Sequence, residues 1–243
     1  MNISLAAEPV FHLWGLTVTN SLLTSWIVVF LLIDFGLAIG HKVKLIPQGK
    51  QNFFEKIFES VFNLCESVAG EKASLFFPLV FTLFIFILLN NWLGLLPGVG
   101  SIGFYEVLHE EKVFIPFFRA GTSDLNTTIA LALIAMGSVE YYGFKHLKFS
   151  YLKKFVNFSS PINFYVGALE TVGELSRVIS FSFRLFGNIF AGEVLLMVMA
   201  FLLPVVGSLP FFGLELFVGF IQALVFSMLT LVFLNVATTG HEG

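Results

Sequence analysis

Charged side chains are scarce in this 243-residue chain. Asp, Glu, Lys and Arg together make up 12% of it, and 57% of the residues are apolar. A typical soluble domain carries roughly 25% charged residues. The 13 Lys and Arg form no block and the formal net charge is only −3, so the composition does not indicate a nucleic-acid partner. These shortages predict an all-α polytopic membrane protein that forms one membrane domain over residues 1–243, with the lipid bilayer as its first partner.

The chain also has only one cysteine and no recognisable catalytic motif. The single Cys65 excludes an internal disulfide, and we expect it to fill apolar space because no metal-ligand pattern surrounds it. The sequence "HEE" at 109–111 lies in a predicted outside loop, where a solvated turn is expected rather than a metal site. The chain contains no HExxH or GxSxG motif. We therefore predict no metal, no cofactor and no catalytic residue.

Long apolar runs are what the sequence does contain. Five of them can supply the ~20 residues that a helix needs to cross a bilayer. The first twenty residues hold neither Lys nor Arg, so the charged start of a cleavable signal peptide is missing and the first run is predicted to stay as a span. The predicted spans are 22–39, 75–96, 127–144, 162–203 and 211–238, and an external tail at 1–21 precedes them.

Basic residues gather in two of the connections between these spans. The two groups are Lys42, Lys44, Lys50, Lys56 and Lys72, and then Lys145, Lys148, Lys153 and Lys154. By the positive-inside rule both connections are cytoplasmic. Five crossings then place the N-terminus outside and the C-terminus in the cytoplasm. We expect a bacterial plasma (inner) membrane from this self-contained topology.

The segment 52–68, between the first two spans, is amphipathic. Phenylalanines and other apolar residues recur on one helical face, and Glu55, Glu59, Asn63 and Glu66 occupy the opposite one. A helix of about 17 residues with this pattern is expected to lie in the membrane interface. Packing against other chains as a soluble-facing helix is the alternative.

Proline is missing from the whole stretch 162–203, although Pro161 precedes it and Pro204 follows it. A single helix is therefore permitted. At 1.5 Å per residue it would measure ~63 Å, about twice the ~30 Å hydrocarbon thickness. We expect it to run obliquely and, after the turn at 203–210, to form a long, strongly tilted hairpin with the last helix.

Polar residues nevertheless enter these apolar helices in two series. Those of the long helix are spaced by 4, 3, 7 and 4 residues and so share one face: Glu170, Glu174, Arg177, Arg184 and Asn188. Glu193 lies nine residues past Arg184, about half a turn away, and faces elsewhere. In the last helix Glu215 and Gln222 are seven apart and share a face. The two series are expected to enter the membrane from opposite sides and to approach each other near Arg184.

Arg184 is the residue of this group that most needs an explanation. A charge at the bilayer centre costs at least ~2.5 to 3.5 kcal/mol. Arg177 can form an ion pair with Glu174 at i, i+3, whereas no carboxylate lies three or four residues from Arg184. Arginine cannot relay a proton, but it can hold a charge in place. Against a carboxylate of another subunit at ~4 Å, it would be worth ~4 kcal/mol at an effective dielectric near 20. That energy roughly cancels the effect of burial, so such a carboxyl would be ionised at Arg184 and neutral in lipid.

Two stretches identify a family. "SRVISFSFRLFGNIFAGE" at 176–193 and "IQALVFSMLTLVFL" at 221–234 closely resemble the a subunit of F-type ATP synthase. "NNWLGLLPG" at 90–98 and "FRAGTSDLNTTIALAL" at 118–133 are similar to its middle segments, and the resemblance covers roughly residues 45–238. It implies five membrane helices plus one interfacial helix. It also implies the stator part of a rotary motor, which borders a ring of c subunits that each carry an essential carboxylate and which is held by the b-subunit peripheral stalk.

The resemblance also assigns roles residue by residue. Arg184 matches the essential arginine of the family and Gln222 the glutamine that faces it. Asn188 and Glu193 match polar residues of the ion path, and Glu215 matches a position of the outer half-channel. Glu170 and Arg177 match positions on the cytoplasmic side, where we add Glu174, and Asn91 matches an outer-side position. The implied function is translocation of H⁺ or Na⁺ through two offset half-channels, with no catalysis in this chain.

One departure and two rival functions remain open at this point. Many family members place a histidine in the outer half-channel, whereas His12, His41, His109, His146 and His241 all lie outside the final hairpin. The outer site would then depend on Glu193 and Glu215, which could share a proton. The rivals are a stand-alone ion channel or transporter, although paired repeats are missing, and an intramembrane enzyme that uses the same two glutamates as acid and base.

Overall fold

The computed structural model describes residues 7–13, 15–40, 49–96, 98–108, 111–148, 151, 155, 161–203 and 207–239. Six helices make up most of these residues: α1 (Asn20–Gly40), α2 (Lys50–Ala69), α3 (Ala73–Leu95), α4 (Leu125–Leu147), α6 (Pro161–Leu202) and α7 (Ser208–Thr238). The described part contains five helical segments long and apolar enough to cross a membrane. An all-α polytopic membrane fold is confirmed.

The helices α3, α4, α6 and α7 form the centre of the bundle. Helix α7 packs against both α3 and α4, and α6 packs against α4 and α7. Large side chains such as Phe76, Leu185, Leu231 and Leu234 are fully buried between them. Cys65 of α2 is also fully buried in this apolar cluster, as expected of a space-filling residue.

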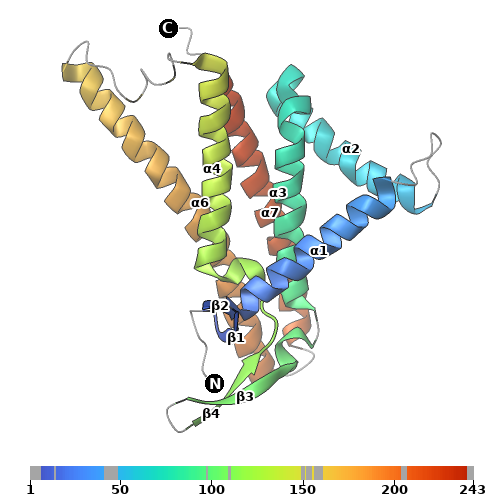
Figure 1. The fold of residues 1–243 in the computed structure, drawn as a ribbon. Coiled ribbons are helices and arrows are strands. Elements are labelled where there is room, and N and C mark those ends of the chain that lie inside the picture. The colour runs from blue at the N-terminus through green and yellow to red at the C-terminus, as the bar shows by residue number, and fades with distance from the viewer. Residues whose placement is uncertain are drawn as a thin grey trace.

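The predicted long helix is present as one piece. Helix α6 runs over 42 residues and is clearly inclined to α4 in Figure 1, where it passes from yellow to orange. Helix α7 returns beside it after the turn. The absence of internal proline allows this length, because no backbone donor is lost within the helix.

Two short β-hairpins lie at one end of the bundle, which we call the hairpin end (Figure 1). Strands β1 (Pro9–Leu13) and β2 (Leu16–Thr19) pair antiparallel, as do β3 (Gly103–Leu108) and β4 (Glu111–Pro116). Short 3-10 turns accompany them: η2 (Val99–Ser101) and η3 (Gly121–Ser123), with a third, η1 (Gly70–Lys72), between α2 and α3. The sequence did not predict these strands, and part of the segment named as an external tail is the first hairpin.

The ends of the six helices lie within three residues of the ends of the predicted segments, whose placement relative to a membrane stays a prediction. The first helix begins at Asn20 rather than at 22, and the last at Ser208 rather than at 211. Helix α2 covers the predicted interfacial segment and packs on α3 and α7, while Phe53 and Phe58 stay exposed on it. Its place in a membrane interface remains a prediction. His41, His109 and His241 lie outside the described residues, and so does the middle residue of the "HEE" sequence at 109–111.

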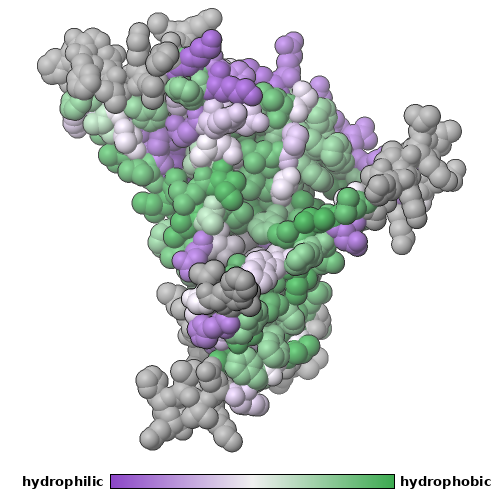
Figure 2. Space-filling view, in the orientation of Figure 1, coloured by the Kyte–Doolittle hydropathy of each residue, from purple (hydrophilic) through white to green (hydrophobic). Residues whose placement is uncertain are grey.

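The surface is arranged as a membrane protein requires. Apolar residues cover the middle of the visible face in Figure 2, and hydrophilic residues gather mainly toward the end where α4 terminates. On α1, Phe30, Ile33 and Leu37 are all more than half exposed. Side chains of this kind are stable in hydrocarbon and not in water. The first described strand and the end of α7 lie at opposite ends of the bundle, which fits five crossings.

Candidate functional site

The two predicted polar series meet where α6 and α7 pack together. The Asn188 side-chain amide donates to Gln222 Oε1 at 2.8 Å. Gln222 is buried, whereas Asn188 is exposed. The contact joins residues 34 apart in the chain, and it lies one helical turn from Arg184.

Arg184 points out of the bundle. Its Nη2 donates to Ser180 Oγ at 3.2 Å, and its guanidinium lies 5.9 Å from the centroid of the Phe181 ring. Within the described residues no carboxylate forms an ion pair with it. The residue is exposed. A permanent cation on an apolar helix is therefore left available for an anion from outside the chain.

Arg177, two turns earlier on the same helix, is in the opposite situation. It forms an ion pair with Glu174, as the spacing of three residues predicts. Its guanidinium also lies 4.9 Å from the centroid of the Phe233 ring of α7. Glu170 is half-buried one turn before Glu174. The charge of Arg177 is thus balanced within this chain.

Tyr151 and Glu140 add to the polar group around Arg177. Burial raises the pKa of the Tyr151 phenol, and the charges of Glu140 and Glu174 raise it further while that of Arg177 lowers it. A neutral phenol is therefore held next to two acids and one base. Neither Tyr151 nor Glu140 was selected from the sequence.

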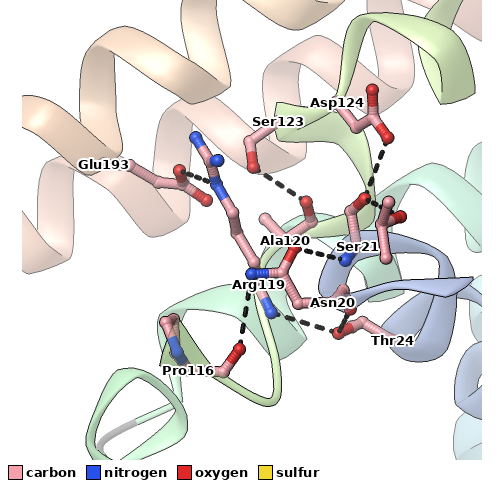
Figure 3. Close-up of polar contacts among 10 residues, drawn as sticks. Asn20, Ser21, Thr24, Pro116, Arg119, Ala120, Ser123, Asp124 and Glu193 are labelled. Carbon is pink, nitrogen blue, oxygen red and sulfur yellow. Dashed lines mark hydrogen bonds and ion pairs between the residues drawn. The ribbon is translucent and has the colours of Figure 1, made fainter. Parts of the chain in front are cut away.

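A pocket of about 500 Å³ opens at the hairpin end. Its lining comes from the residue before β1, the end of α3, η2, strand β4 with the segment after it, and α6, and it includes Glu8, Arg119, Phe190 and Glu193. Arg119 Nε donates to Glu193 Oε2 at 3.1 Å, and the two side chains are 13% and 21% exposed. Figure 3 shows the Arg119 side chain reaching from the segment before η3 toward Glu193 on α6. A largely buried ion pair therefore lies on the pocket wall.

Glu215 of α7 lies against Gly192, the residue before Glu193 in the chain. It is 4% exposed, and its Oε1 has no hydrogen-bond partner among the described residues. A Cβ atom built on Gly192 would come within 1.9 Å of that oxygen. The carboxyl of Glu215 consequently lies against the backbone of α6 at Gly192. The next residue is Glu193, the other acid predicted for the outer path. Only glycine at position 192 allows this approach.

A buried polar network holds the hairpin end together. The Asn91 side-chain amide donates to the Gly219 carbonyl at 2.9 Å, and Thr122 Oγ1 donates to Asn91 Oδ1. Ser21 Oγ donates to Asp124 Oδ2 at 2.9 Å, and Thr128 and Ser182 share a hydrogen bond at 3.1 Å. Asn91, predicted as an outer-side residue, thus joins α3, α7 and η3. Buried polar groups that are satisfied in this way fix a single arrangement of helices.

Arg119 is a further site residue that the sequence reasoning missed. It was not selected there because it lies outside the apolar runs. The signal was available in "FRAGTSDLN", where an arginine precedes the polar turn that carries Asp124. Its partner is 74 residues away, and no local spacing reveals such a pair.

Comparison with known proteins agrees with this architecture. The family described as ATP synthase A chain matches residues 22–235. A protein named ATP synthase subunit a from Trichlorobacter lovleyi is 34% identical over 89% of this chain and 86% of its own length. One of the same name from Gloeobacter violaceus is 36% identical over 92% of this chain and 85% of its own. The chain therefore belongs to the ATP synthase A chain family, as an integral multi-pass membrane subunit that serves proton transport in ATP synthesis and is not itself catalytic.

Proposed function

We propose that this chain forms two offset half-channels for H⁺ or Na⁺ and couples ion flow to rotation of a ring of c subunits. The observation that carries the proposal is the exposed Arg184, whose charge is not balanced by a carboxylate within the described residues. Each c subunit would present one carboxylate to this guanidinium as the ring turns. The hairpin end would face the outside and the C-terminus would face the cytoplasm. The membrane would be a bacterial plasma membrane.

The outer path would begin at the pocket of the hairpin end. It continues past Glu193 and the buried Glu215, while Asn91 fixes the helices around it. An ion leaving Glu215 would neutralise a rotor carboxylate that has just separated from Arg184. Once neutral, that carboxyl can cross lipid, because the large penalty for burying a charge is gone.

The inner path would lie along the other half of α6. Glu170, Glu174 and Arg177 line it, and the ion pair with Glu174 keeps Arg177 from competing with Arg184 for rotor carboxylates. The rotor carboxyl releases its ion there and is held ionised by Arg184. Asn188 and Gln222 fix α6 to α7 next to that point. The fixed charge of Arg184 also blocks direct leakage, since a cation approaching it is repelled.

The driving force follows from the membrane potential. One elementary charge that crosses 100 mV supplies about 2.3 kcal/mol. The bond-forming step of ATP synthesis would take place in other subunits of the complex. The b-subunit peripheral stalk would hold this chain against the torque.

ATP-driven proton pumping in inverted membrane vesicles tests the proposal. Arg184→Ala in a normally assembled complex is expected to abolish pumping, because rotor carboxylates would lose their counter-ion. Ser180→Ala is the matched control, since it removes only the hydroxyl that accepts from Arg184, and it is expected to pump at a near-normal rate. An Arg184→Ala complex that pumps normally would refute the proposal.

Two further measurements separate the rivals. Glu215→Gln with unchanged transport would remove that residue from the outer path. The purified complex is expected to contain a small apolar hairpin subunit in many copies. Ion flux through this chain alone in liposomes would instead favour a stand-alone channel or transporter. Turnover of a lipid-like substrate by the isolated chain would favour an intramembrane enzyme, although the described residues hold no cluster of His, Cys, Asp and Glu that could bind a metal.

A further inference from the structure

The ion pair between Arg119 and Glu193 is not explained by the two half-channels. An ion-accepting glutamate needs no permanent cation beside it, and a buried ion pair is often no more stable than an apolar contact of similar volume. Both partners are nonetheless largely buried, at 13% and 21% exposure of their side chains. The pair also lies on the wall of the pocket where the outer path would start.

Arg119 is held in place from both ends. Its backbone N–H donates to Thr24 Oγ1 of α1 at 3.3 Å, and its neighbour Ala120 packs directly on Gly94 of α3, where a Cβ atom would come within 2.4 Å. Its guanidinium lies 5.7 Å from the centroid of the Phe190 ring, one turn before Glu193. The segment around Arg119 is therefore fixed to α1 and α3, while its side chain reaches α6 (Figure 3).

The Glu193 carboxyl is held by the same segment. The Arg119 Nε–H donates to its Oε2 at 3.1 Å, and the Ser123 hydroxyl donates to the Ala120 carbonyl within the segment itself. A carboxylate on a long helix would otherwise choose among several rotamers. Charge-assisted hydrogen bonds are short and directional, so they select one of these rotamers.

We infer that Arg119 is a positioning residue of the outer path, which directs the Glu193 carboxylate into the pocket of the hairpin end. This inference rests on the outer path proposed above. Arg119 does not itself carry the ion, because a guanidinium keeps its protons. It determines instead where the first buried acceptor meets water from outside.

Glu8 completes the group on the outer side. It belongs to the segment before the first strand, lines the same pocket, and its backbone carbonyl accepts from the Asn20 N–H at the start of α1. The positive charge of Arg119 acts on Glu8 as well as on Glu193. Among the described residues, the acids whose charge meets that of the guanidinium are thus Glu8, just before β1, and Glu193 of α6. Arg119 lies in the same pocket lining as both acids.

The test uses the assembled complex in inverted vesicles, with ATP-driven pumping measured alongside the amount of this chain in the membrane. Arg119→Gln keeps a similar size and removes the charge, and we expect it to lower pumping about tenfold or more, because an ionic hydrogen bond to Glu193 is lost. Arg119→Lys keeps the charge and is expected to retain at least about half of the normal rate. Tyr105→Ala, at an exposed position of β3, is the control and is expected to pump normally.

A double variant separates positioning from folding. If Arg119 acts through Glu193, Arg119→Gln added to Glu193→Gln should cause no further loss of pumping. Losses that multiply would overturn the inference, and so would an Arg119→Gln complex that assembles and pumps normally. A lysine variant that accumulates normally but is as impaired as the glutamine variant would overturn it too.

These outcomes are distinct from failure of the proposed function. A chain in which Arg184→Ala abolishes pumping while Arg119→Gln leaves it intact keeps the half-channels and loses only the positioning role. Should Arg119→Gln not accumulate, the lysine variant decides, because it preserves the charge on which the inference depends.

Discussion

Arg184 and Arg119 are the same residue type in two different regions, and the chain treats them in opposite ways. Arg119 at the hairpin end has a carboxylate at 3.1 Å, an aromatic ring and a backbone anchor on α1. Arg184, in the middle of α6, has a hydroxyl at 3.2 Å and a ring at 5.9 Å, and it faces outward. An internally paired arginine can organise a site, whereas an arginine left exposed on an apolar surface is available to a partner. The difference between the two regions lies in the neighbours that the fold provides.

Arg177 is on the same helix as Arg184 but is paired with a carboxylate, as Arg119 is. It therefore gives the sharpest test of the comparison. We expect Arg184→Gln to lower ATP-driven pumping by more than about 100-fold, because a contact worth ~4 kcal/mol with rotor carboxylates is lost. Arg177→Gln is expected to lower it by less than about tenfold, since its partner is Glu174 of the same helix and the pair is surface-like in strength. Pumping rates normalised to chain content measure both. Equal losses would show that internal pairing does not distinguish the two arginines.

The contact between Gly192 and Glu215 is the next largest expected effect. Gly192→Val would place side-chain atoms where the carboxyl lies, and overpacking of this kind costs typically about 1 to 3 kcal/mol. We expect chain content or pumping to fall about tenfold. Gly137→Ala on α4 has open space around it and serves as the control, with no loss expected. Normal behaviour of Gly192→Val would mean that Glu215 does not need to lie against α6.

A smaller effect is expected for the hydrogen bond that joins α6 to α7 near Arg184. Asn188→Ala and Gln222→Ala should each lower pumping roughly fivefold, as expected for the loss of a hydrogen bond worth about 1 kcal/mol. The double variant should be no worse than either single one. Effects that multiply would indicate that the two amides act independently of each other.

The smallest effect concerns Glu8. Burial raises the pKa of its carboxyl above the ordinary value of 4.5, and the charge of Arg119 only partly opposes this. As the pH rises above 4.5, Glu8 ionises in the opened hairpin before it ionises in the folded one. The free energy of opening the first hairpin, and with it the protection from hydrogen exchange, should therefore fall until the pH passes the pKa of the folded state. Hydrogen-exchange protection factors of residues 9–19 measure this in the solubilised complex. In Glu8→Gln the decline should disappear, and a decline of unchanged size would assign it to another group.

Local patterns were sufficient for most of the fold. The apolar runs fixed the helices to within three residues, because a membrane-spanning helix satisfies its own backbone and needs only length and hydropathy. The i, i+3 spacing likewise predicted the ion pair of Arg177 with Glu174. The two hairpins at the hairpin end were not predicted, since short strands such as Leu16–Thr19 depend on pairing and not on hydropathy.

What the amino-acid sequence determined by itself is the membrane class, the single long helix α6, and the face that carries Arg184 without a nearby acid. These properties follow from hydropathy, helical period and the absence of proline, all of which act within a few turns of one segment. Only the tertiary structure decided that Arg119 meets Glu193, that Glu215 rests on Gly192, and that Asn188 meets Gln222. Each of these contacts joins helices or loops far apart in the chain, so packing of the whole bundle selects the partners.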